Sequence, residues 1–173
     1  MTNKNQEIRR AMKIIKRSFN ELGLSVEQDT VYHGVEFIGT QIDADSFSMA
    51  IEVAYGPIAS ELIIAARFSL VAQVHDYTGF YSRINVINDL VMDIGHFAIN
   101  MKEGTITFMS GLDRYGDGFN AKQVVSSLKR FIYHGREGFK YLLRISAPEN
   151  LSQEATKEII AEMVGRLSKG RKE

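Results

Sequence analysis

Apolar residues recur at helical spacing in four segments, which predicts four amphipathic helices. In "IRRAMKIIKRSFNEL" (residues 8–22) they are separated by four, three, four and three positions, and Gly23 is suited to end this helix in the left-handed conformation. Similar stripes occupy residues 76–95, 120–143 and 151–167. We expect Gly95 to end the second helix, and Gly135 and Gly138 to kink or interrupt the third.

Alternation of apolar and polar residues predicts strands between these helices. In "SFSMAIEVAY" (residues 46–55) every second residue is apolar and large, so one face should be buried and the other wet or lightly covered. "YHGVEFIGTQI" (32–42) precedes it and "ELIIAARFSLV" (61–71) follows, and the short connections favour an antiparallel meander. A short strand near residues 24–27 is an open alternative. "HFAINM" (96–101) and "TITFMSGL" (105–112) should pair as a hairpin across Gly104.

The predicted order of elements is α-β-β-β-α-β-β-α-α. This order predicts an α+β fold in which helices pack on an antiparallel sheet of about five strands. A chain of 173 residues suits a single domain, residues 1–173. We expect its core at residues 5–145, a C-terminal helical extension at 149–168, and a frayed tail at 169–173.

Composition adds an expectation about the compartment. The chain contains no cysteine, which fits a reducing cytoplasm and excludes disulfides and thiol chemistry. The first 17 residues alternate charged and apolar side chains, unlike a signal peptide. No segment approaches the roughly 20 apolar residues that span a bilayer. We therefore expect a cytoplasmic protein without membrane contact.

Charge is segregated along the chain although the net charge is zero. Residues 1–17 hold six lysines and arginines against one glutamate, whereas residues 18–66 hold eight acidic residues and no lysine or arginine. These charges either neutralise one another within the fold, or form an acidic surface for a basic partner, or form complementary faces in a dimer. The basic first helix also invites a nucleic-acid interpretation, which we favour less because no aromatic residues interleave with its cations to stack on bases.

Two asparagines three positions apart, Asn85 and Asn88, lie on or beside the apolar face of the second predicted helix. A buried amide without hydrogen-bond partners costs about 1–3 kcal/mol, so these side chains need partners. The nearest candidates are backbone groups of a neighbouring strand or of the turn that follows. We expect both asparagines to tie the helix to that backbone, with contact to a ligand as the alternative.

The same segment carries a family resemblance. Asn85 and Asn88, then Gly95, Phe97 and Ala98, then Gly104 and the strand 105–110 resemble the YbjN family of putative bacterial sensory transduction regulators. The similarity covers about residues 5–145 and rests mainly on the order of elements. It implies a fold like that of type III secretion chaperones and a non-enzymatic, partner-binding protein. The terminal helix and the neutral net charge depart from that chaperone pattern.

Motifs for catalysis or metal binding fail when they are inspected. The four histidines (His33, His75, His96 and His134) show no metal-ligand spacing, and we expect them at the surface. "DRYGDGFNAKQV" (113–124) places Asp113, Asp117 and Gly118 as in a calcium loop, but Tyr115 and Val124 occupy ligand positions. No phosphate loop or GxSxG motif is present. We expect no enzymatic activity, no metal and no cofactor.

The sequence therefore favours a cytoplasmic regulator or chaperone-like adaptor that binds another protein. A peptide lying along the sheet or its edge would be held by main-chain hydrogen bonds, with apolar side chains in pockets. Candidate contacts on the less apolar strand faces are Glu36, Glu52 and Arg67. A secretion-type chaperone homodimer is the first alternative, and a small-ligand binder or enzyme with an assembled site is the second.

Overall fold

The computed structural model describes residues 3–32, 35–44, 47–56, 61–71, 77–90, 92, 94–100, 102–113, 120–146 and 153–169. Its elements, in chain order, are α1 (Asn3–Glu21), β1 (Gln28–Tyr32), β2 (Val35–Asp43), β3 (Ser48–Gly56), β4 (Glu61–Val71), α2 (Tyr77–Leu90), β5 (His96–Asn100), β6 (Thr105–Asp113), α3 (Ala121–Ser146) and α4 (Gln153–Lys169). The calcium-like residues Asp117 and Gly118, two of the histidines (His33 and His75) and the last four tail residues lie outside the described part of the chain.

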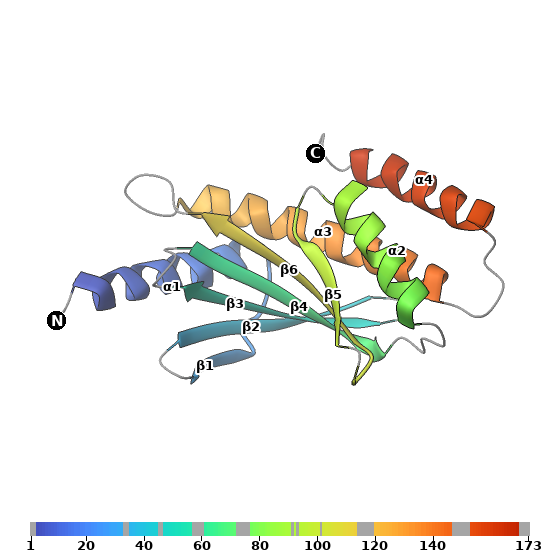
Figure 1. Cartoon of the computed structure of the whole chain (residues 1–173). Coiled ribbons are helices and arrows are strands. Elements are labelled where there is room, and N and C mark those ends of the chain that lie inside the picture. Colours follow the sequence, from blue (N-terminus) through green and yellow to red (C-terminus); the bar gives the residue numbers. More distant parts are fainter. Residues whose placement is uncertain are drawn as a thin grey trace.

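The strands form one open antiparallel sheet in the order β1-β2-β3-β4-β6-β5. The α+β class and the meander are therefore confirmed, and Figure 1 shows the helices gathered over the sheet. The strand count is corrected from about five to six. β1 is the additional strand, at residues 28–32; it begins directly after the short strand considered near residues 24–27, and Glu27 N–H still donates to Gly39 O of β2.

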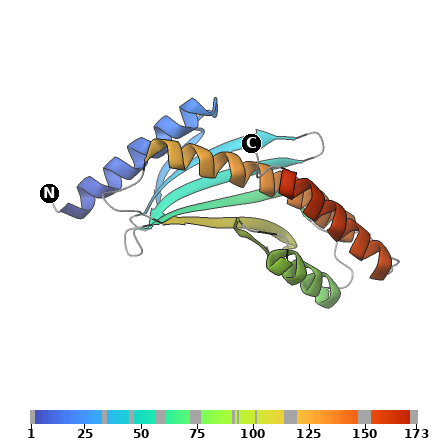
Figure 2. The same cartoon turned by 90° about the horizontal axis from the view of Figure 1, so that it is seen from above.

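One face of the sheet carries the core. Its inward side chains alternate along the strands, as in Met49, Ile51, Val53 and Tyr55 of β3, which are all buried. Helices α1 and α3 pack side by side on this face, as Figure 2 shows from above. Helix α2 lies beside β5 at one edge, and α4 packs on α3.

Six phenylalanine rings link the sheet to α3 through the core. Phe68 of β4 stacks on Phe139 of α3 with ring centroids 3.9 Å apart, and Phe97 lies 4.6 Å from Phe108. The expected interruption of the third helix is absent, because α3 runs continuously from Ala121 to Ser146. Its glycines instead allow close approach: a Cβ at Gly138 would lie 2.6 Å from the Phe97 ring.

Of the two predicted helix ends, the one at Gly23 is confirmed and the one at Gly95 is not. Gly23 ends α1 with a φ of +71°, as predicted, and Leu24 N–H donates to Phe19 O. Helix α2 ends at Leu90, so the prediction that Gly95 stops it is wrong. Met92 N–H donates to Ile87 O, which closes the helix before Gly95 is reached.

Helix α3 is covered on more than one side, which explains the burial of His134. We predicted His134 at the surface, but its side chain is only 1% exposed. Because α3 contacts α1, α2, α4 and β6, its buried arc is wider than a single stripe. His96, by contrast, is exposed as predicted.

Polar contacts join α3 to α4 around Glu162. Arg144 Nη1 donates to its carboxylate at 2.8 Å and Tyr141 Oη donates at 3.1 Å. The hydrogen bond from Arg144, followed by that from Tyr141, lowers the pKa of the Glu162 carboxyl below its usual value. Burial and the Glu162 carboxylate raise the pKa of Tyr141. Beneath these groups Met163 is fully buried, so α4 docks by both apolar and polar contacts.

Candidate functional site

Strand β6 is longer than the strand beside its outer side. Its inner side pairs with β4 as far as Asp113, opposite Glu61. Its outer side pairs with β5 only from Thr105 to Met109. Among the described residues, no strand pairs with the outer side of residues 110–113. We call this unpaired segment the β6 notch.

Hydrogen bonds at Asn88 fix which backbone groups face the β6 notch. Phe97 N–H donates to Asn88 Oδ1 (2.8 Å), and Asn88 Nδ2 donates to Phe97 O (2.9 Å), so both Phe97 groups point away from β6. Phe108, the residue paired with Phe97, must then point its own groups toward β4. Because backbone polar groups alternate along an antiparallel strand, the N–H and C=O of Gly111 face the β6 notch.

The tie between the second helix and the strand backbone is therefore present for Asn88. The two bonds occupy the positions that a neighbouring strand would use, so Asn88 covers the outer edge of β5 at Phe97. Asn85 differs from the prediction, because its side chain is exposed and forms no hydrogen bond with any described residue. Phe97 contributes a buried ring to the core in addition to its backbone contacts.

Gly95 turns the chain away from β6 just before β5 begins. Its φ of +67° lies in the left-handed region that favours glycine. A Cβ at this position would lie 2.3 Å from Met109 O, so the turn also needs the absence of a side chain. An uninterrupted β5 would extend alongside Ser110 and Gly111. The turn at Gly95 thus leaves the β6 notch open.

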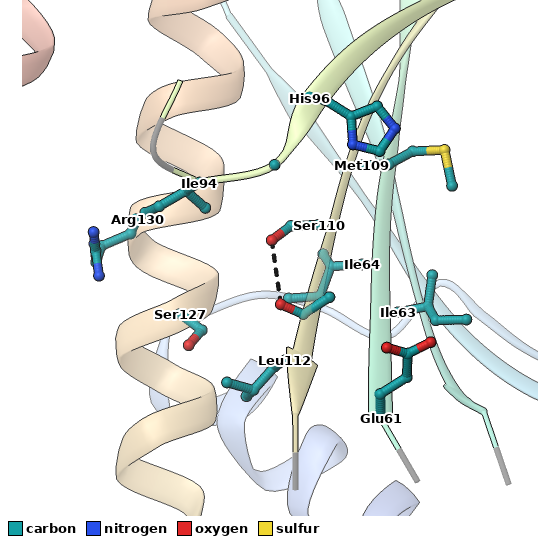
Figure 3. Close-up of a pocket in the computed structure, with 12 residues that line it drawn as sticks. Glu61, Ile63, Ile64, Ile94, His96, Met109, Ser110, Leu112, Ser127 and Arg130 are labelled. Atoms are coloured by element: carbon teal, nitrogen blue, oxygen red, sulfur yellow. Dashed lines mark hydrogen bonds between the residues drawn. The ribbon is translucent and has the colours of Figure 1, made fainter. Parts of the chain in front are cut away.

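A hollow of about 800 Å³ surrounds the β6 notch. Figure 3 shows its lining on two sides of β6. The side between β6 and α3 is lined by Ile64, Ile94, Ser110, Leu112, Ser127 and Arg130, and the other side by Glu61, Ile63, His96 and Met109. Each side therefore offers apolar side chains with a few polar groups at the rim.

The polar side chains of the hollow lie on different sides of β6. Ser110 Oγ donates a long hydrogen bond of 3.4 Å to Gly111 O, drawn as a dashed line in Figure 3. His96 lies across β6 from Ser127, so these side chains do not converge on one point. Within the described residues no three histidine or acidic side chains cluster as metal ligands. The hollow combines backbone groups that have no partner strand among the described residues with apolar surface.

The three residues predicted as a partner surface are divided between the two faces of the sheet. Glu52 and Arg67 form an ion pair with each other on the face that bears no helix among the described elements. Glu36 lies on the covered face with buried Ile38, and its carboxylate is 4.0 Å from Lys16 of α1. A hydrogen bond to Asp29 and the Asp29 and Glu36 charges raise the pKa of Lys16. The three residues therefore form no common surface.

Sequence reasoning missed the residues that line the hollow around the β6 notch. Glu61, Ile63, Met109 and Gly111 lie on strands that were predicted, but nothing marked them as a site. One signal was available: the predicted strand 96–101 is shorter than the predicted strand 105–112, and in the structure the difference is larger, with five residues in β5 and nine in β6. Comparisons with family models, with curated proteins and with solved structures find no match for this chain. No helix among the described residues is long and apolar enough to cross a bilayer.

Proposed function

We propose that this protein binds an extended segment of another protein by strand addition at the β6 notch. The observation that carries the proposal is the pair of Gly111 backbone groups directed at a hollow with no strand in it among the described residues. Unpaired backbone groups at a sheet edge are a template for an incoming strand. The incoming segment would run antiparallel to β6, in line with β5, and end against Gly95.

Side chains of the bound segment would alternate between the two sides of β6. Those directed at α3 meet Ile64 and Leu112, and those on the other side meet Ile63 and Met109. Main-chain hydrogen bonds supply affinity that depends little on sequence, and these apolar sites supply preference. The opposite sheet edge, β1, is less suited, since Gln28, Asp29 and Thr30 are polar and exposed and Val31 is its only exposed apolar residue among those described.

Proline at position 111 tests strand addition. Gly111→Pro removes the N–H that faces the β6 notch and leaves the β4–β6 hydrogen bonds in place, because those come from residues 110 and 112. Gly111→Ala is the matched control, since its Cβ would meet only Glu61 Oε2 at 3.4 Å. Linear peptides selected on the wild-type protein from a displayed library should bind the alanine variant, and bind the proline variant at least about tenfold more weakly.

Two outcomes would contradict strand addition at the β6 notch. Peptides that bind the folded proline variant as well as the wild type occupy another surface. A library that yields no binder at all argues against a peptide-binding function.

The family interpretation remains part of this proposal. The order of elements, with β1 added, is compatible with a YbjN-like, chaperone-like regulator that acts in the cytoplasm. In a chaperone-like homodimer, a strand of a second copy would fill the β6 notch. Light scattering on the wild type and on Gly111→Pro distinguishes the two cases: a dimer that becomes monomeric only in the proline variant favours the homodimer.

A further inference from the structure

Lysines and arginines fall into two groups according to whether they have an acidic partner. Lys16, Arg67, Lys140, Arg144 and Arg166 each form an ion pair within the fold. Eight exposed cations form neither an ion pair nor a side-chain hydrogen bond with any described residue: Lys102, Lys157 and a group of six, namely Arg9, Arg10, Lys13, Arg17, Lys122 and Lys129. All six belong to α1 or to the first turns of α3. We call them the cationic roof.

The cationic roof lies on one side of the molecule. Helices α1 and α3 pack against each other over the covered face of the sheet, as seen in Figure 2. Helix α1 buries Met12, Ile15 and Phe19 toward the sheet, so Arg10, Lys13 and Arg17, three and four positions apart, are on its opposite side. Lys122 and Lys129 are two turns apart on α3, opposite buried Val124 and Leu128.

Carboxylates that could neutralise the cationic roof from within are scarce. On α1 the described acidic residues are Glu7, which accepts a hydrogen bond from Tyr55, and Glu21 at the last position. On α3 the first acidic residue is Glu137, which already pairs with Lys140. Like charges three and four positions apart destabilise a helix slightly, and an external anion would relieve this repulsion.

The surroundings of the cationic roof discriminate among anionic partners. Protein interfaces are usually centred on buried apolar or aromatic anchors, and among the exposed large apolar residues only Tyr133 lies on the outer side of α3. Helices α1 and α3 cross in Figure 2, so a rod with closely spaced phosphates that runs over the crossing can contact cations of both helices.

We propose that the cationic roof binds the phosphate backbone of a double-stranded nucleic acid, independently of its base sequence. The lack of aromatic residues among these cations argues against stacking on bases but not against contacts to phosphates. The six side chains spread over two rigid helices match a partner with a repeating charge. This inference is independent of the β6 notch, which lies at the opposite side of α3, beside Ser127.

The test is fluorescence anisotropy of the full-length chain with a labelled DNA duplex of mixed sequence, titrated at several salt concentrations. Arg10→Gln/Lys13→Gln/Lys129→Gln should weaken binding at least about tenfold and reduce the slope of log affinity against log salt by roughly three. Lys102→Gln/Lys157→Gln is the control, because both lysines are exposed outside the cationic roof. This control should bind as the wild type does, and an RNA duplex should bind comparably.

Three results would overturn the inference. They are the absence of duplex binding at low salt, an equal loss of affinity in the control variant, and tighter binding to phosphatidylserine vesicles or to poly-glutamate than to the duplex. Thermal unfolding of both variants shows that a loss of binding does not come from loss of the fold.

Discussion

Asn88 and Phe97 show how one side chain can stand in for a strand. The amide of Asn88 supplies one acceptor and one donor, which match the N–H and C=O of Phe97 at 2.8 and 2.9 Å. Sequence reasoning identified the need for such partners, because an amide on an apolar helix face must be satisfied. It could not separate Asn88 from Asn85. Residues three apart on a helix differ by about 60°, and that is enough to leave Asn85 exposed.

Replacing Asn88 tests whether its two hydrogen bonds to Phe97 hold α2 against β5. Asn88→Ala leaves the two Phe97 backbone groups without their partners, so the free energy of unfolding should fall by about 1–3 kcal/mol. Asn85→Ala is the matched control and should change it by less than about 0.5 kcal/mol. Chemical denaturation of both variants measures the difference. Equal stabilities would show that the Asn88 bonds contribute nothing, and a loss of peptide binding with unchanged stability would make Asn88 a contact residue.

At the scale of elements, the predicted interruption of the third helix is absent, and the packing of its glycines gives the reason. Glycine was interpreted as a breaker of α3, yet Gly135 and Gly138 lie inside a continuous helix. Their role is to admit aromatic rings: a Cβ would lie 3.0 Å from Phe108 at Gly135 and 2.6 Å from Phe97 at Gly138. Sequence gives the backbone preference of glycine but not what packs against it. The same residue type therefore ends α1 at Gly23 and allows close packing in α3.

Two helix glycines provide a matched pair of substitutions. Gly138→Ala forces the Phe97 ring to move and should destabilise the protein by about 1–3 kcal/mol through overpacking. Gly165→Ala in α4 meets nothing within 4 Å and should stabilise it by up to about 1 kcal/mol through helix propensity. Thermal unfolding should shift in opposite directions. A shift of the same sign in both variants would contradict the packing role of Gly138.

At the scale of the whole molecule, the order of elements other than β1 was predictable because those elements have a clear hydrophobic period. The order also fixes an α+β sheet covered on one face. The candidate site was not predictable in the same way. It arises from a difference in length between β5 and β6 and from the direction in which Gly95 turns the chain, and both depend on tertiary pairing. Charge segregation was visible in the sequence, but which cations have partners was not.

The two proposed binding surfaces, the β6 notch and the cationic roof, lie on different sides of α3. The β6 notch lies beside Ser127, and the cationic roof includes Lys122 and Lys129 on the outer side. A protein with both could bind an extended peptide at one surface and a nucleic acid at the other without competition. Each surface has its own test, so failure of one leaves the other standing.

Amide hydrogen exchange at Gly111 tests the central claim most directly. In the free protein the Gly111 N–H faces the β6 notch and should exchange rapidly, whereas the Phe97 N–H, bonded to Asn88, should be protected. Saturation with a selected peptide should protect Gly111 and leave Phe97 unchanged. Strong protection of Gly111 in the free protein, or new protection confined to other strands in the complex, would contradict strand addition at this edge.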